Sequence, residues 1–248
     1  NLRKVMEEVL RPENFCVSYT GERESLDTVK TQAAEIKKVL FNGQKPEPVK
    51  QAPCVKKNEA FKTSGQVQYV AQNGNFRKKG LEYTGALEIL KVILSYDYLW
   101  INLRVKGGAY GCMSGFKRNG ESFLVSYRDP HLKRTLEVYQ GVPDYIRAFE
   151  ADEREMTKYI IGTISNKDVP RTPQMQGSIS KTAYFSNVTE DMLQKERNQI
   201  LGAQKEDIQK LAALVEAVLS DDQICVVGSE TAIEKAEDVF MEVKPLIG

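Results

Sequence analysis

The sequence predicts an α+β fold with two layers, in which helices pack on one face of a mainly antiparallel sheet. Apolar residues recur at helical spacing over residues 84–105, which indicates a long and largely buried helix. Residues 110–116 and 122–127 alternate like paired strands around Arg118-Asn119-Gly120-Glu121, and Asn-Gly favours a hairpin turn. Predicted helices outnumber predicted strands, so the pattern favours a single sheet with helices on one face.

The first residues predict a helix to Leu10, a strand over residues 15–20 and a helix over residues 25–41. The other end of the chain repeats this order, with a helix over 205–219, a strand over 223–228 and a helix over 230–246. A unit that occurs twice indicates two related domains, the first of them truncated. The chain also begins with Asn1 inside an amphipathic pattern, so we expect a fragment of a longer protein.

A polar stretch separates the two predicted domains. Residues 42–64 contain Pro46, Pro48, Pro53 and several lysines, and their weak apolar periodicity predicts a linker without regular structure. We therefore expect the closing helix–strand–helix unit of a preceding domain over residues 1–43, a linker over 44–64 and a complete last domain over 65–248.

The remaining elements of the last domain follow from the same patterns. We expect a strand over 66–71, a turn at 73–75 and helices over 131–151, 152–164, 177–186 and 189–203. Asp129-Pro130 marks the start of the first of these helices. Aspartate is a favoured N-cap, and proline at the first helical position lacks only an N–H that would have no partner.

The composition argues against several kinds of partner. Lys plus Arg number 35 against 34 Asp plus Glu, a net charge of +1, so no overall field attracts nucleic acid or an anionic membrane. No apolar run approaches the roughly 20 residues that cross a bilayer, which predicts a soluble protein of the cytoplasm, or of an organellar matrix in a eukaryote. The widely spaced cysteines predict reduced thiols; they are Cys16, Cys54, Cys112 and Cys225.

The chain carries no recognisable catalytic apparatus of its own. Zinc hydrolases hold their metal with two or three imidazoles, as in H-x-x-E-H, whereas His131 is the single histidine here. No G-x-S-x-G elbow and no glycine-rich nucleotide loop occurs, and cysteine chemistry would need His131 beside one of four scattered thiols. We therefore expect no metal site, no catalytic residue and no activity on this chain alone.

Residues 96–111 combine side chains that suit a binding site. Gly107 and Gly108 end the predicted helix and let the chain turn, which brings Arg104 toward Tyr110. Both side chains donate hydrogen bonds, so they suit a peptide carbonyl and the charge that builds on its oxygen during hydrolysis. The residues alone favour a plainer alternative, in which Arg104 complements the helix dipole and Tyr110 packs in the fold. Three nearby aromatic residues are expected in the core: Tyr96, Tyr98 and Trp100.

Three motifs in order resemble one family of peptidases. The first runs Tyr96-Asp97-Tyr98-Leu99-Trp100 and leads into Arg104-Val105-x-Gly107-Gly108-Ala109-Tyr110-Gly111. The others are Ser126-Tyr127-Arg128-Asp129-Pro130 and Tyr159-Ile160-Ile161-Gly162-Thr163-Ile164. They resemble the C-terminal half of presequence proteases and falcilysin-type peptidases, which are zinc metallopeptidases of the pitrilysin/insulinase class. The resemblance covers nearly the whole chain, from the turn at residues 11–14 to the helix at residues 206–208.

The resemblance implies four homologous domains in two halves around a large chamber, each with the fold of mitochondrial-processing-peptidase-like metallohydrolases. Zinc would be bound by H-x-x-E-H in the first domain, and this chain would hold the end of the third domain and the complete fourth. Its partners would be the N-terminal half of the same polypeptide and unstructured peptide substrates. An arginine and a tyrosine of the last domain reach the substrate in this family, and Arg104 and Tyr110 match them, with Gly107 and Gly108 shaping the turn.

The predicted function is that of the non-zinc-binding C-terminal part of a zinc metalloendopeptidase, which forms half the chamber and contacts the peptide. The alternative is a structural or binding module of the same fold, as in the core subunits of respiratory complexes. An upstream segment without H-x-x-E-H would favour that alternative. An autonomous enzyme of another class has no residues to support it.

Overall fold

The computed structural model describes residues 1–44 and 55–247, and the chain divides into two compact units. The small unit comprises Asn1–Cys54 and Val169–Glu190, and the sheet unit comprises Val55–Asp168 and Asp191–Gly248. The helices of the small unit are α1 (Leu2–Val9), α2 (Leu26–Lys38) and α7 (Pro173–Phe185). Gly177 of α7 lies so close to Thr20 that a Cβ at this position would clash with the threonine side chain. Helix α7 is thus packed on the N-terminal residues, although it is far from them in the sequence.

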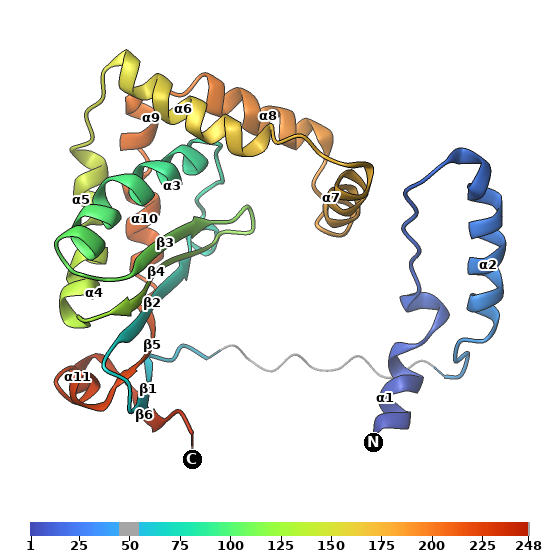
Figure 1. Ribbon diagram of the computed structural model, residues 1–248, viewed down its shortest axis with the longest axis horizontal. Coiled ribbons are helices and arrows are strands. Elements are labelled where there is room, and N and C mark those ends of the chain that lie inside the picture. Colours follow the sequence, from blue (N-terminus) through green and yellow to red (C-terminus); the bar gives the residue numbers. More distant parts are fainter. Residues whose placement is uncertain (45–54, 248) are drawn as a thin grey trace. The chain divides into compact units, whose positions relative to one another are not determined.

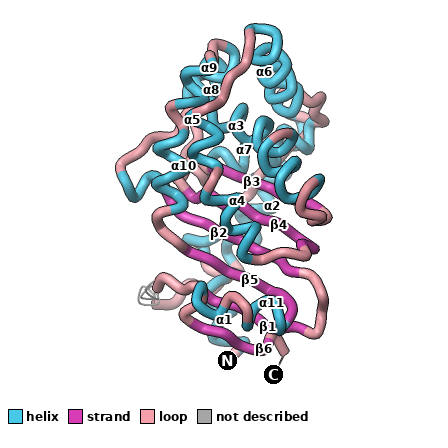
Figure 2. The backbone as a smooth tube through the Cα atoms, turned by 90° about the vertical axis from the view of Figure 1, so that its left-hand side faces the viewer, coloured by secondary structure: helices cyan, strands magenta, loops and turns pink. Residues whose placement is uncertain are grey.

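The sheet unit contains one six-stranded sheet with the order β3-β4-β2-β5-β1-β6 (Figure 2). The strands are β1 (Glu59–Thr63), β2 (Gln68–Asn75), β3 (Gly111–Phe116), β4 (Glu121–Asp129), β5 (Gln223–Ser229) and β6 (Glu242–Pro245). Strand β4 pairs antiparallel with β3 and β2, and β2 pairs antiparallel with β5. Only β1 makes parallel pairs, with β5 and β6. The predicted mainly antiparallel sheet is therefore confirmed.

Helices cover one face of this sheet, as α3, α4, α5 and α10 show (Figure 1). The helices that follow the first strands along the chain are α3 (Ala86–Tyr96), α4 (Lys133–Gln140), α5 (Val142–Arg147), α6 (Glu153–Lys167), α8 (Glu190–Leu201), α9 (Lys205–Gln209), α10 (Ala212–Leu219) and α11 (Glu230–Glu234). Along β2, Val70 and Gln72 are fully buried, whereas Tyr69 and Asn73 are exposed. Because α4 and α10 contact β2, the buried residues face the helices.

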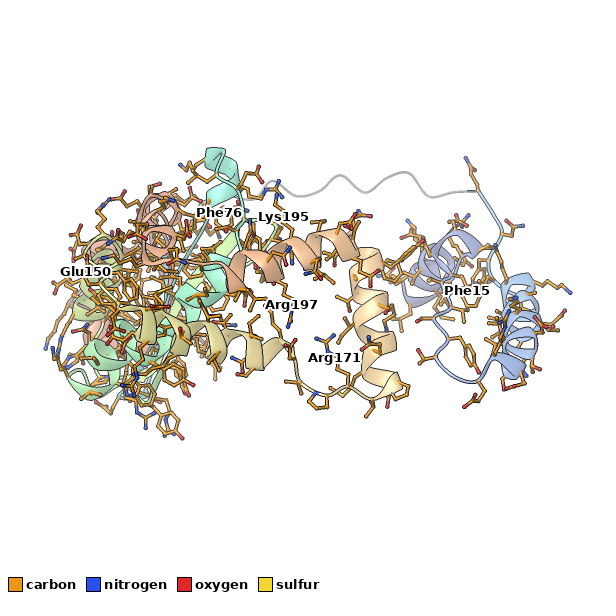
Figure 3. The ribbon with its side chains drawn as sticks, turned by 90° about the horizontal axis from the view of Figure 1, so that it is seen from above. Phe15, Phe76, Glu150, Arg171, Lys195 and Arg197 are labelled. Carbon is orange, nitrogen blue, oxygen red and sulfur yellow. The ribbon has the colours of Figure 1, made fainter. Side chains whose placement is uncertain are left out.

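The core lies between the helices and the sheet. Phe76, which follows β2, is fully buried and lies among the packed side chains of the sheet unit (Figure 3). Tyr139 of α4 is also fully buried, and its hydroxyl donates a hydrogen bond of 3.1 Å to the Val70 carbonyl. This bond satisfies a polar group that would be costly to bury alone. Among the described helices, none combines the length and apolar character needed to cross a bilayer.

Three predicted elements differ in the structure. Residues 15–20 form no strand, because a strand needs a neighbour for its backbone hydrogen bonds and the described part of the small unit offers none. The helix predicted over 230–246 ends at Glu234, and residues 242–245 form β6 instead. Strand β1 lies in the predicted linker, whose residues 45–54 fall outside the described residues. Pairing of β1 with β5 and β6 stabilises a polar segment that shows no strand pattern by itself.

Local close packing explains two further differences. The turn predicted at residues 73–75 lies within β2, where a Cβ on Gly74 would clash with the Val218 carbonyl of α10. The helix predicted over 131–151 is divided into α4 and α5 at Gly141, and α4 begins only at Lys133. Asp129 nevertheless caps this region, because its carboxylate accepts hydrogen bonds from the His131 N–H at 2.9 Å and from a threonine hydroxyl, that of Thr135, at 2.7 Å. The helices predicted over 152–164, 177–186 and 189–203 are confirmed as α6, α7 and α8, whereas the helix predicted over 205–219 is divided into α9 and α10.

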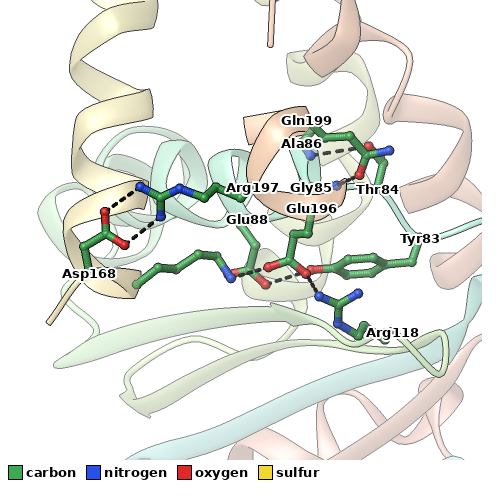
Figure 4. Close-up of polar contacts among 11 residues, drawn as sticks. Tyr83, Thr84, Gly85, Ala86, Glu88, Arg118, Asp168, Glu196, Arg197 and Gln199 are labelled. Carbon is green, nitrogen blue, oxygen red and sulfur yellow. Dashed lines mark hydrogen bonds and ion pairs between the residues drawn. The ribbon is translucent and has the colours of Figure 1, made fainter. Parts of the chain in front are cut away.

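A buried carboxylate joins α8 to two other segments of the sheet unit (Figure 4). The Glu196 side chain is only 5% exposed and forms ion pairs with Arg118, in the β3–β4 turn, and with Lys167 at the end of α6. The next residue of α8, Arg197, binds both carboxylate oxygens of Asp168, at 2.6 and 2.8 Å. We call these ion pairs the α6–α8 clamp. It fastens the chain on both sides of the segment that contains α7.

Candidate substrate-binding site

The segment between α3 and β3 contains a π-helix, η4 (Trp100–Val105), in place of the end of the predicted continuous helix. Helix α3 ends at Tyr96, and Asp97 departs from helical geometry with φ −110° and ψ −90°. The Asp97 carboxylate accepts a hydrogen bond from the Tyr159 hydroxyl of α6, which holds the chain at this break. In η4 the Lys106 N–H donates to the Ile101 carbonyl, five residues earlier, at 2.9 Å. This wider turn changes the direction in which the following side chains point.

Gly107 and Gly108 form the sharp turn that the sequence predicts. The N–H groups of Gly108 and Ala109 donate to the carbonyls of Arg104 and Leu103, each at 2.9 Å. Gly108 has a φ of 80°, which a side chain would oppose, and a Cβ on Gly107 would clash with the Leu103 carbonyl. The turn therefore requires glycine at both positions, and it directs the chain from η4 into β3.

The structure brings Arg104 and Tyr110 together. The Arg104 guanidinium donates a hydrogen bond of 2.7 Å from Nη1 to the Tyr110 carbonyl, and it lies 5.8 Å from the centroid of the Tyr110 ring. Both side chains are exposed, and the Tyr110 hydroxyl makes no hydrogen bond within the described residues. Two exposed side chains that can donate hydrogen bonds thus lie close to one another.

Two of the three aromatic residues around this site differ from the prediction. Trp100 is 37% exposed, and the Arg104 guanidinium lies 4.3 Å from its ring centroid, a cation–π contact rather than core packing. Tyr96 is 72% exposed, so it is not a core residue either. Tyr98 is half-buried against the core, and its hydroxyl donates to the Val138 carbonyl at 3.0 Å. Tyr98 thus packs against the core as expected, whereas Tyr96 ends α3 and Trp100 begins the π-helix, where the chain leaves the geometry of the predicted continuous helix.

Two functional candidates are not found by sequence reasoning. The Tyr127 ring lies 5.5 Å from the Tyr110 ring, centroid to centroid, and the Arg128 guanidinium lies 5.6 Å from the Tyr110 centroid. Both residues stand in the second family motif, but no pattern in the sequence assigns them a role. Their contacts depend on the pairing of β3 with β4, which places Gly111 opposite Tyr127.

The charge of Arg104 also affects the pKa of the Cys112 thiol. Burial raises the pKa of the Cys112 thiol to about 11, while the nearby Arg104 guanidinium acts in the opposite direction. Cys16, Cys112 and Cys225 are free thiols in the structure, as predicted, and Cys54 lies outside the described residues.

We expect Cys112 to react slowly with iodoacetamide at pH 8, because a pKa of about 11 leaves only about one thiol in 10³ ionised. The rate should rise with pH up to about 11, and Arg104→Ala should slow it further by removing a charge that favours the thiolate. Peptide mapping by mass spectrometry measures each cysteine separately, with the exposed Cys16 as the internal reference. A faster reaction at Cys112 in Arg104→Ala would contradict this electrostatic coupling.

The described residues do not fit a zinc site. His131 is the single histidine of the sequence, and its backbone N–H is bound to Asp129. Within residues 1–44 and 55–247, no three His, Cys, Asp or Glu side chains are grouped so that they could hold a metal ion.

Solved structures share this fold at low sequence identity. The inactive domain of an M16 peptidase from Pseudomonas fluorescens has a TM-score of 0.55 at 16% identity, over 90% of this chain and 52% of that one. Pitrilysin has a TM-score of 0.52 at 18% identity, over 81% of this chain and 22% of its own. These likenesses establish the fold and confirm that it is of the pitrilysin-peptidase type.

Relatives by sequence are closer. Protein HypA of Clostridium perfringens is 42% identical over 247 residues, which cover 100% of this chain and 25% of that protein. Presequence protease 1 of Arabidopsis thaliana, described as chloroplastic/mitochondrial, is 30% identical over 258 residues, covering 98% of this chain and 23% of that protein. The chain thus spans about a quarter of the length of these relatives. Residues 58–230 match the family described as PreP C-terminal domain, and the chain belongs to this family.

Proposed function

We propose that this chain is the C-terminal, non-zinc-binding part of a zinc metalloendopeptidase, in which it forms half of an enclosed chamber and contacts the peptide. The observation that carries the proposal is the convergence of Arg104 and Tyr110, two exposed donors that adjoin one end of β3. Family membership supports the reaction class, since the relatives include proteins named presequence protease. The partners would be the N-terminal half of the same polypeptide and unstructured peptides.

Arg104 and Tyr110 would bind the carbonyl oxygen of the peptide bond. One guanidinium N–H of Arg104 is used by the Tyr110 carbonyl, which fixes the orientation of the fork and leaves its other donors for a substrate. The cation–π contact with Trp100, at 4.3 Å from the ring centroid, also holds the guanidinium in place. Donors fixed in this way stabilise negative charge on an oxygen without having to reorganise during the reaction. The zinc ion of the other half would activate the attacking water.

Reconstitution tests this proposal. The chain is mixed with the separately expressed N-terminal half carrying H-x-x-E-H, and hydrolysis of an unstructured fluorogenic peptide is followed together with zinc content. We expect hydrolysis only in the mixture, with zinc bound to the N-terminal half. Stoichiometric zinc and hydrolysis with this chain alone would contradict the proposal. A stable complex in which this chain does not change the rate would favour the alternative, a purely structural module.

A further inference from the structure

Arg128 has an unusual backbone conformation next to the candidate site. Its φ is 49°, in the left-handed region that favours glycine, although it lies near the end of strand β4. The neighbouring strand β2 shifts its register between Gln68 and Val70, so an irregularity of the ladder coincides with this residue. Strained backbone and bulges cluster at functional sites, where they redirect a side chain.

The strained conformation directs the Arg128 guanidinium to Tyr110. It lies 5.6 Å from the Tyr110 ring centroid, and the Arg104 guanidinium lies 5.8 Å from the same centroid. The Tyr110 N–H in turn donates to the Arg128 carbonyl at 3.3 Å, so the strained residue is tied to the site through its backbone as well. Two positive charges are therefore held around one exposed phenol.

Neither guanidinium is neutralised by a carboxylate of the described chain. Arg104 and Arg128 form no ion pair among the described residues, and the hydrogen bond of the Arg104 side chain goes to a neutral carbonyl. The adjacent Asp129 is 1% exposed, and its carboxylate already binds the His131 N–H and the Thr135 hydroxyl. An internal salt bridge therefore does not explain why Arg128 adopts this conformation.

The surroundings suit a peptide that carries a negative charge. The Trp100, Tyr110 and Tyr127 rings supply apolar contact area beside the two cations. Arginine binds carboxylates with two parallel hydrogen bonds, a geometry that lysine lacks. Since both cations lie within 6 Å of the Tyr110 ring centroid, a carboxylate bound by Arg128 would be only a few residues from a carbonyl bound by Arg104 and Tyr110.

We propose that Arg128 is a second substrate-contacting residue, which binds a carboxylate of the peptide close to the carbonyl held by Arg104 and Tyr110. This inference rests on the proposed function, because it assumes that a peptide binds at Tyr110. The carboxylate belongs either to the peptide's C-terminus or to an aspartate or glutamate side chain, and the chemistry of recognition is the same.

Trp100 makes the test direct, since it is the single tryptophan of the sequence and contacts Arg104. Peptides of one unstructured, tryptophan-free sequence are titrated into the full chain, and Trp100 fluorescence and calorimetry report the Kd. One pair compares a C-terminal acid with its amide, and a second pair compares an internal Asp with Asn. We expect a carboxylate to tighten binding by about tenfold or more in one of the pairs, as for a charge-assisted hydrogen bond.

Three variants separate this role from a structural one. Arg128→Gly introduces a residue that tolerates a positive φ and removes the whole side chain with its guanidinium, so the variant should remain at least as stable while losing the preference for the carboxylate. Arg128→Lys should retain only part of the preference. Arg154→Gln, at an exposed arginine of α6 with no ion pair among the described residues, should leave the preference intact.

The outcomes distinguish the inference from the proposed function. Loss of the preference in Arg128→Gly with unchanged thermal stability supports the inference, and the responding peptide pair identifies the source of the carboxylate. Peptide binding that is equal for all four peptides, or a preference that survives in Arg128→Gly, overturns the inference and leaves the contact at Arg104 and Tyr110 in place. If none of the peptides binds by either measurement, the result contradicts the proposed peptide contact at Arg104 and Tyr110, and with it the inference about Arg128.

Discussion

Turnover of the reconstituted peptidase is expected to fall by about 10²-fold or more when Arg104 is replaced by alanine, the loss typical of a positioned oxyanion donor. Tyr110→Phe should have an effect of the same order, because it removes only the hydroxyl and keeps the ring between its neighbours. Both kcat and kcat/KM should fall together, since the donors act on charge that develops in the transition state. Steady-state kinetics on one fluorogenic peptide measure the effect.

Matched substitutions show whether the loss is specific to the site. Arg154→Ala removes an exposed arginine of α6, and Tyr184→Phe removes an exposed hydroxyl of α7. Neither should change turnover appreciably. If Arg104→Ala and Tyr110→Phe both keep the turnover of the unmodified protein, these residues have no role in the chemistry. A rise in KM alone would reduce their role to binding the ground state.

The second large effect concerns stability and the buried carboxylate of the α6–α8 clamp. We expect replacement of both Arg118 and Lys167 by methionine to lower the free energy of unfolding by about 3–5 kcal/mol, because Glu196 would remain buried without a countercharge. Urea denaturation, followed by circular dichroism, measures this loss.

A third substitution provides the control for the clamp. Adding Glu196→Leu to the two methionines removes the buried charge and fills its place with apolar side chains, so most of the lost stability should return. If the double variant is as stable as the unmodified chain, solvent or a rearrangement satisfies the carboxylate. If the triple variant is no more stable than the double, the loss arises from packing rather than from the unpaired charge.

Local patterns predict the central part of the fold well. The buried helix α3 and the β3–β4 hairpin follow from the spacing of apolar residues and from Asn119-Gly120, signals that lie within a few residues of one another. The parallel strands β1 and β6 are not predicted, because their pairing joins residues near position 60 to residues near position 243. Each is short and polar by itself, and only the partner identifies it as a strand.

Local sequence patterns likewise predict one part of the candidate site and not the other. The convergence of Arg104 and Tyr110 is predictable, because Gly107 and Gly108 sit between them and reverse the chain over a short distance. The role of Arg128 is not predictable, since its positive φ depends on how β4 meets an irregularity in β2. The π-helix is not predictable from the sequence either, because the break before it depends on a hydrogen bond between Asp97 and the Tyr159 hydroxyl of α6.

The course of the chain through the two units affects how they can be separated. Residues 169–190 belong to the small unit, whereas the residues before and after them belong to the sheet unit. A protease that cuts once between the N-terminal segment and β1 would therefore release only part of the small unit as a separate polypeptide, and residues 169–190 would stay covalently attached to the sheet unit at both ends. Residues 169–190, which include α7, can be removed more easily, because the α6–α8 clamp holds the chain both before and after this segment. A chain that starts at Val55 and carries a short loop in place of residues 169–190 would give the sheet unit as an independent polypeptide, with Trp100 and Arg104 still in place to report on peptide binding.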